Sequence, residues 1–231
     1  MPHQRGRHYR YYDLVMAAFV TVLLCANLIG ASKVATLFGF TFGAGVLFFP
    51  ISYVFGDVLT EVYGYRKSRR VIWIGFFALL LATLTFQAVA HLPAPPDAES
   101  QRFGEAFGLL LGLTPRIVLG SLLAYFLGEF ANAYVLAKLK VRTEGRFFWL
   151  RALASTLVGQ GLDTGVFLLV AFYGVFPKEV LLAVFLSNYA FKLGVEALML
   201  PFTYAVVGFL KRAEGMDAYD RDTDFNPFRL T

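Results

Sequence analysis

Two acidic residues, Asp57 and Glu61, lie in an apolar stretch that ends in a basic cluster. Four residues apart, they share one face of a helix and lie one turn from each other. The stretch 48–70 begins as an apolar run and carries four cations within 66–70. We expect Glu61 to neutralise these adjacent cations, and Asp57 to line a polar cavity inside a helical bundle.

Four more charged side chains interrupt apolar runs further along the chain: Glu129, Asp163, Lys192 and Glu196. A charge at the centre of a bilayer costs roughly 2.5–3.5 kcal/mol on insertion scales. Together with Asp57 they make four acids and one base, so they cannot all neutralise one another. The remainder must meet polar partners, water, protons or a ligand, and this imbalance predicts a polar cavity at mid-membrane depth.

Amide side chains accompany these charges at helical spacing. Asn188, Lys192 and Glu196 recur every four residues and therefore share one helix face. A pair between Lys192 and Glu196 would neutralise both residues without excluding a binding site, and this alternative stays open.

Two further pairs have a spacing of three residues: Glu129 with Asn132, and Gln160 with Asp163. Each pair shares a helix face. We expect the two acids to be functional. For Asn132 and Gln160, hydrogen bonding between helices explains the position as well as ligand binding does.

Asn27 and Tyr53 complete the candidate substrate-binding residues. Asn27 lies in the outer third of the first apolar run, where bonding between helices is its more common role. Tyr53 belongs to an aromatic group in the second run. Its ring could stack on a flat ligand, because aromatic faces recognise any nucleobase, although packing is the more common role of a single aromatic residue.

Several enzyme classes lack their residues in this chain. The sequence contains no H-E-x-x-H zinc motif and no G-x-x-x-x-G-K-[ST] nucleotide loop. Only His91, of three histidines, lies near an apolar run, which does not support a serine–histidine protease within the membrane. We expect no catalytic residue, no metal and no cofactor, although acid-only chemistry through Asp57 and Asp163 stays open.

Long apolar runs must position these residues. Of the 231 residues, 58% are hydrophobic and only 16% charged, whereas soluble domains have about 25% charged residues. Three runs without any charge are long enough to cross about 30 Å of hydrocarbon as a helix. The sequence predicts an all-α polytopic membrane protein, with a short amphipathic helix over 101–113. Its six transmembrane helices are expected over 12–32, 43–63, 71–91, 115–138, 148–174 and 180–210.

The expected organisation is a cytoplasmic N-terminal arm over 1–11, a transport domain over 12–210 and an acidic cytoplasmic tail over 211–231. We expect the tail to be mobile. Sixteen Lys and Arg residues fall on the side of both termini and four on the opposite side, so both termini should be cytoplasmic. These cations lie in loops between spans rather than on one face, so the net charge of +5 does not indicate a nucleic-acid partner.

A specific motif is the run Phe-Pro-Ile-Ser-Tyr-Val-Phe-Gly-Asp-Val-Leu-Thr-Glu-Val-Tyr-Gly-Tyr at 49–65, followed by Arg-Arg-Val-Ile-Trp. This motif resembles the queuosine precursor transporter family, which is also called the vitamin uptake transporter family. Supporting matches are Thr-Pro-Arg-Ile-Val-Leu at 114–119, Asn-Ala-Tyr-Val-Leu-Ala-Lys-Leu-Lys at 132–140, and Gln160 with Asp163. The resemblance covers roughly residues 12–210.

The resemblance implies an importer of 7-deazaguanine bases, the queuosine precursors, in the inner membrane of a bacterium. The expected substrates are 7-cyano-7-deazaguanine and 7-aminomethyl-7-deazaguanine, for salvage into tRNA. The resemblance also implies a six-helix fold similar to the substrate-binding components of energy-coupling-factor transporters, without an ATPase partner. The expected partners are therefore a purine-like base and the lipid bilayer, and a homo-oligomer stays open.

The candidate residues fit such a substrate. A deazaguanine presents a ring N–H beside an NH₂ group, and a carboxylate can accept both hydrogen bonds at once. Glu129, Asp163 and Glu196 are the candidates, and the sequence does not choose between them. We favour Glu196 or Asp163 as this carboxylate. Asn188, Gln160 and Asn27 are expected to lie around the ring.

Two other functions remain as alternatives to the importer. The first is an intramembrane enzyme that uses paired aspartates, and the second is the substrate-binding subunit of an ATP-driven vitamin importer. The energy source is open as well. The excess of acids suggests proton coupling, because burial favours the neutral form of a carboxyl group, but a facilitator with metabolic trapping of the substrate explains the same residues.

Overall fold

The computed structural model describes residues 9–30, 34–37, 40–43 and 49–229 of the chain. In order, its elements are α1 (Tyr12–Gly30), β1 (Val34–Leu37), β2 (Phe40–Gly43), α2 (Phe49–Tyr63), α3 (Tyr65–Ala90), α4 (Ala98–Leu111), α5 (Pro115–Arg142), α6 (Phe148–Phe172) and α7 (Lys178–Glu214). Five helical stretches are long and apolar enough to cross a membrane: Tyr12–Ile29, Tyr65–Ala90, Ala98–Arg142, Phe148–Phe172 and Lys178–Glu214. The predicted all-α polytopic membrane architecture is confirmed.

The second predicted span, 43–63, differs in its first part. Residues Val34–Gly43 contain a short antiparallel hairpin in which Val34 pairs with Gly43 and Leu37 with Phe40. The helix that follows, α2, has only 15 residues. At about 1.5 Å per residue it is shorter than the hydrocarbon layer. Residues 44–48 lie outside the part of the chain that the structure describes.

A short α2 is possible because other helices surround it. It packs against α1, α3, α5 and α7, and every residue from Gly56 to Tyr65 is buried. Val58 and Val62 are fully inaccessible and belong to the main apolar core, together with Leu136 of α5. Helix α2 therefore carries its polar side chains into the interior of the bundle, where other helices must satisfy them.

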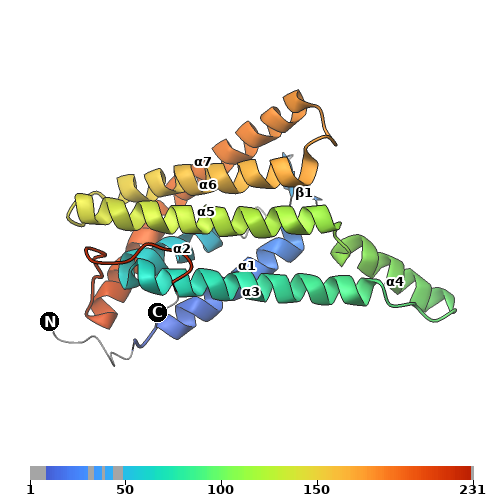
Figure 1. Cartoon of the computed structure of the whole chain (residues 1–231), viewed down its shortest axis with the longest axis horizontal. Helices are drawn as coiled ribbons and strands as arrows, with labels where there is room; N and C mark the ends of the chain where they lie inside the picture. Colours follow the sequence, from blue (N-terminus) through green and yellow to red (C-terminus); the bar gives the residue numbers. More distant parts are fainter. Residues whose placement is uncertain (1–8, 31–33, 38–39, 44–48, 230–231) are drawn as a thin grey trace.

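Helices α3, α5 and α6 run side by side as long rods, and α7 crosses them (Figure 1). Helices α5 and α6 approach each other closely at two glycines. A Cβ on Gly128 would stand 2.8 Å from the Asp163 Cβ, and a Cβ on Gly159 would stand 2.7 Å from the Asn132 Cβ. Small residues allow such contact between membrane helices. The contact brings Glu129 of α5 close to Gln160 of α6.

The start of α1, the turn between α2 and α3, the turn between α5 and α6 and the end of α7 gather at one end of the bundle (Figure 1). We call this end the cytoplasmic end, because the loops and helix termini there carry the excess of Lys and Arg. The helix predicted over 101–113 is observed as α4, near the opposite end. Asp97 caps α4 by accepting a hydrogen bond from the Ser100 N–H at 2.8 Å.

The acidic tail was expected to be mobile, but the structure places residues 217–229 against the cytoplasmic end of the bundle. The Ala218 N–H donates to the Val62 carbonyl at 3.2 Å, and the Asp220 side chain accepts from the Tyr65 N–H at 2.9 Å. Trp73 Nε1 donates to the Pro227 carbonyl at 2.8 Å. The tail thus satisfies backbone groups at the α2–α3 junction that have no partner within their own helices.

Candidate functional site

A cavity of about 700 Å³ lies between the helices, from the middle of the bundle to the α4–α5 connection. Its size is within the range of about 300–1,000 Å³ that is common for small-molecule sites. Leucine and phenylalanine side chains form much of the wall, among them Leu113, Phe86 and Phe167. A polar group set into an apolar wall is the usual composition of a ligand pocket.

Seven of the ten residues that the sequence proposed for substrate binding line this cavity. They are Asn27, Tyr53, Glu129, Gln160, Asp163, Asn188 and Lys192. The other three, Asp57, Asn132 and Glu196, are not among the residues of the cavity wall. The structure therefore divides the predicted residues into a lining group and a group behind the wall.

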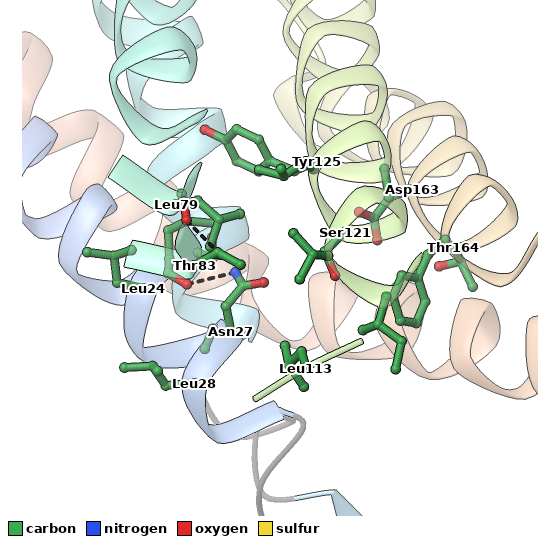
Figure 2. A pocket seen from close by; sticks show the side chains of 18 of the residues that line it. Leu24, Asn27, Leu28, Leu79, Thr83, Leu113, Ser121, Tyr125, Asp163 and Thr164 are labelled. Atoms are coloured by element: carbon green, nitrogen blue, oxygen red, sulfur yellow. Dashed lines mark hydrogen bonds between the residues drawn. The ribbon is translucent and has the colours of Figure 1, made fainter. Parts of the chain in front are cut away.

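Asn27 and Thr83 lie on one side of the cavity, opposite Ser121, Asp163 and Thr164 (Figure 2). Asn27 Nδ2 donates to the Leu23 carbonyl of its own helix at 2.9 Å, and Thr83 Oγ1 donates to the Leu79 carbonyl at 2.7 Å. These bonds hold both side chains against their own helices. The Asn27 amide oxygen and the Thr83 hydroxyl oxygen can then each accept a hydrogen bond from a guest.

Lys192 forms an ion pair with Asp163 across α6 and α7. The Lys192 Nζ lies 2.5 Å from Asp163 Oδ2 and 3.2 Å from Thr164 Oγ1. The sequence left open a pair between Lys192 and Glu196, one helical turn away, but the observed ion-pair partner is Asp163. The positive charge in the cavity wall is thereby matched to one of the acids.

Two acids line the cavity, Glu129 and Asp163. Asp163 is paired with Lys192, whereas Glu129 has no cation in contact with its carboxylate among the described residues. It makes no ion pair and no hydrogen bond within the described part of the chain. It lies against the backbone of α2, where a Cβ added to Gly56 would be 3.4 Å from Glu129 Oε2. Nearby, Gln160 Oε1 is buried and also lacks a hydrogen-bond partner among the described residues. Both are acceptors that a ligand can satisfy.

Behind the cavity wall, α2 packs against α7, and the carboxyl groups of Asp57 and Glu196 lie close enough to interact. Their residues are only 1% and 0% exposed. Asn132 Nδ2 donates to Asp57 Oδ1 at 3.1 Å. If both carboxyl groups were ionised, Asp57 Oδ2 and both Glu196 oxygens would have no hydrogen-bond partner in the described structure, because carboxylates only accept.

Glu61, one turn from Asp57 on α2, is fully neutralised. Arg151 donates to both of its oxygens, at 2.6 and 3.1 Å, and Lys211 Nζ lies 2.7 Å from Oε1. Lys140 Nζ lies 3.5 Å from Oε1 and also contacts Asp217. The residues Glu61, Lys140, Arg151, Lys211 and Asp217 are called the Glu61 cluster below.

The prediction that Glu61 is neutralised is confirmed, but its source was wrong. The cations come from α5, α6 and α7, not from the adjacent cluster at 66–70. Sequence reasoning counted Lys140, Arg151 and Lys211 only as loop charges that set the orientation. One signal was available, because Arg151 falls inside the apolar segment 148–174, where a charge needs a partner.

Among the described residues, no group of three or more His, Cys, Asp or Glu side chains is arranged to hold a metal ion.

Comparison with known proteins gives two relatives and one family. A family described as "Putative vitamin uptake transporter" matches residues 43–206. The chain is similar to the "Probable queuosine precursor transporter" of Bacillus subtilis (strain 168), with 37% identity over 193 residues that cover 83% of this chain and 81% of the relative. It is also similar to the "Queuosine precursor transporter" of Escherichia coli (strain K12), with 27% identity over 177 residues, covering 74% and 75%. No solved structure matches the chain significantly.

Proposed function

Because the chain belongs to the family described as "Putative vitamin uptake transporter", we propose that it imports a queuosine precursor, a 7-deazaguanine base, into the cytoplasm. It is a multi-pass protein of the bacterial inner membrane. The observation that carries the proposal is the position of Glu129, an acid without a cation in the wall of a largely apolar cavity of about 700 Å³. Such a cavity suits a flat base with one strongly hydrogen-bonding edge.

The hydrogen-bonding pattern of the base supports Glu129 as its main contact. A deazaguanine presents a ring N–H and an exocyclic NH₂ side by side, and a carboxylate accepts from both. Asp163 is already paired with Lys192, and Glu196 does not line the cavity. These placements favour Glu129 over the two acids that the sequence favoured.

Gln160 and the other polar residues of the wall complete the proposed contacts. The Gln160 amide, whose oxygen lacks a partner among the described residues, can meet the remaining polar edge of the ring. Asn27 and Asn188 face the cavity from α1 and α7. Tyr53 supplies an aromatic surface for the face of the base. Asp57, Asn132 and Glu196 act behind this layer rather than on the base.

Binding to the purified protein tests the role of Glu129. In Glu129→Gln one acceptor oxygen becomes an NH₂ donor that faces the donors of the base. Hydrogen bonds to charged groups are worth about 1.5–3 kcal/mol, so affinity for 7-aminomethyl-7-deazaguanine should fall about 10- to 100-fold. Isothermal titration calorimetry measures this change. Adenine, which has no such pair of donors, should bind weakly to both proteins.

The matched control is Glu179→Gln, which removes an exposed carboxylate from the first turn of α7, away from the cavity wall. Its affinity should equal that of the unsubstituted protein. If the unsubstituted protein binds no 7-deazaguanine, the proposed substrate is wrong. If Glu129→Gln binds as tightly as the control, Glu129 is not the recognition residue.

Transport itself is tested in cells that cannot make the precursor. Expression of the chain should restore queuosine in tRNA when the base is supplied in the medium. We further propose that the base crosses unchanged and without an ATPase partner. A labelled base should therefore be recovered chemically intact from vesicles that contain the purified protein alone, and chemical conversion of the base would favour the enzyme alternative.

A further inference from the structure

We propose that Asp57 and Glu196 form a proton-binding site that couples uptake of the base to inward movement of a proton. The coupling to a base rests on the function proposed above, whereas the proton site does not. The two residues come from α2 and α7, so the site joins two helices behind the cavity wall.

The first argument is the contact between the two carboxyl groups. They lie close enough to interact, on two helices that pack together, and are almost completely buried, at 1% and 0% exposure. A hydrogen bond between two carboxyl groups requires a proton on one of them. With that proton, Asp57 Oδ2 and a Glu196 oxygen, which otherwise lack partners in the described structure, satisfy each other.

The second argument is the character of the groups around the pair. Tyr53 and Glu61 face it from α2, and Glu129 and Asn132 face it from α5. None of these four side chains carries a positive charge that could neutralise the Asp57–Glu196 pair. From α6 and α7, Arg151 and Lys211 bind Glu61, and Asp163 and Lys192 form an ion pair whose charges act on Glu129.

The cations that could have neutralised the pair are bound elsewhere. Arg151, Lys140 and Lys211 contact Glu61, and Lys192 contacts Asp163. Two buried carboxyl groups in contact cannot both ionise without a large repulsion, so like charges at this distance favour a shared proton. The pair thus holds one proton and one negative charge.

The third argument links the proton to the base. Glu129 must be ionised to accept two hydrogen bonds from the base, and it lies close enough to Asp57 and Glu196 for their charges to interact. A proton on the pair removes one negative charge from the surroundings of Glu129. Protonation of the pair and binding of the base therefore favour each other, which is a thermodynamic coupling between two sites.

The proton balance of one transport cycle is simple. A proton from the outer solution binds between Asp57 Oδ2 and the Glu196 carboxylate, and the base binds at Glu129. After the cytoplasmic end opens, the base leaves and the O–H bond of the pair releases its proton to the cytoplasm as H⁺. One proton enters with each molecule of base, and no other reactant is needed.

The proton site is tested first without any base. Infrared difference spectra of the purified protein at neutral pH should show the carbonyl stretch of a protonated carboxyl group, shifted in deuterated water. Asp57→Asn and Glu196→Gln should each remove this band, whereas Glu179→Gln should retain it. If the band is absent, or is lost only in Glu129→Gln, the pair holds no proton and the proposal is overturned.

The coupling is tested in vesicles with an imposed pH gradient, acidic outside. With one proton per neutral base, a gradient of one pH unit can drive about tenfold accumulation. Asp57→Asn keeps a side chain that can donate to Glu196, as protonated Asp57 does. This variant should bind the base and exchange it across the membrane, but should not accumulate it. Glu196→Gln gives the same comparison in case Asp57→Asn does not fold.

Each outcome of the transport experiment decides between the proposals. Accumulation by Asp57→Asn in response to the pH gradient, or accumulation by the unsubstituted protein with a sodium gradient alone, overturns proton coupling through this pair. If the unsubstituted protein transports the base at a rate and to a level that do not depend on the pH gradient, the coupling is overturned but the proposed function is not. Failure to bind any 7-deazaguanine, with the infrared band present, overturns the proposed function and leaves the proton site intact.

Discussion

Asp57 and Glu61 are one turn apart on α2 and equally buried, at 1% exposure each, but their surroundings are opposite. Glu61 contacts the cations Arg151, Lys140 and Lys211. Asp57 contacts an amide and another carboxyl group. Burial of an acid in a membrane bundle therefore does not define its role. The partners that neighbouring helices supply determine whether the charge is fixed or can change.

The Glu61 cluster is a fixed arrangement. It joins α2, α5, α6, α7 and the tail at the cytoplasmic end, and Arg151 donates to both Glu61 oxygens in a bidentate geometry. Breaking a buried ion pair by removing one partner leaves an uncompensated charge. The Asp57–Glu196 pair, by contrast, can change its net charge by gaining or losing one proton. In the proposed transport cycle, the residues of the Glu61 cluster hold the cytoplasmic end together and the Asp57–Glu196 pair carries the proton.

The largest expected effect comes from Glu61→Gln. It leaves Arg151, which is 0% exposed, without its main counter-charge, and such a loss typically costs about 3–5 kcal/mol. The thermal unfolding temperature of the detergent-solubilised protein measures this change. Asp57→Asn, one turn away, is the matched control, because no cation loses a partner. An equal loss of stability in the two variants would contradict the contrast between the two acids.

An intermediate effect is expected from Gly159→Ala, which tests the contact that places the acids. The new Cβ would lie 2.7 Å from the Asn132 Cβ and 2.9 Å from the Gly128 carbonyl oxygen, so α5 and α6 must separate. Overpacking of this kind costs about 1–3 kcal/mol, again measured as a shift in thermal unfolding.

The control for this substitution is Gly194→Ala on α7, where no atom lies within 4 Å of an added Cβ. Its stability should be unchanged or slightly higher, because alanine favours the helix. A stable Gly159→Ala protein with unaltered binding would show that the α5–α6 contact does not position Glu129 and Gln160.

The smallest expected effect concerns Asp217, the tail residue of the Glu61 cluster. Burial opposes its ionisation, but hydrogen bonds and charge from Lys140 and Lys211 outweigh this and hold the pKa of Asp217 below its usual value. A lowered pKa in the folded state contributes stability above the unfolded pKa of about 3.9 and loses it as pH falls through the folded value. The contribution is small, since the side chain is 38% exposed.

Asp217→Asn should therefore unfold at a lower temperature than the unsubstituted protein at neutral pH. The difference should shrink as the solution is made strongly acidic. Unfolding curves recorded for both proteins across this pH range measure it. A difference that stays constant or grows towards low pH would mean that the charge of Asp217 does not support the cluster.

Much of the architecture could be predicted from patterns of residues that are close together in the sequence. Apolar runs located the helices with ends that differ from the observed ones by up to six residues, and the uneven distribution of Lys and Arg predicted the common side of both chain ends. Helical spacing also identified candidates of which seven of ten line one cavity, Glu129 among them; Gln160, for which the sequence left bonding between helices equally open, lines it as well. These features depend on residues close together in sequence.

The rest depends on contacts between distant segments. Glu61 contacts Arg151 and Lys211, which are 90 and 150 residues away in sequence. The spacing of residues within one helix cannot predict such pairs. The hairpin at Val34–Gly43 was hidden because its apolar residues continue the hydrophobic run of the next helix. The tail was misjudged because its polar composition suggests disorder, whereas its side chains supply acceptors that the α2–α3 junction lacks.

The packing of the tail has a consequence for the biosynthesis of the protein. Asp217 and Asp220 leave the ribosome after α1 to α7, although Asp220 accepts from the Tyr65 N–H at the start of α3 and Asp217 contacts Lys140 at the end of α5. Helices inserted early in translation therefore wait for the final stretch of the nascent chain before their cytoplasmic ends are complete. A product truncated before Asp217 would lack both of these acceptors at the α2–α3 junction and at the end of α5.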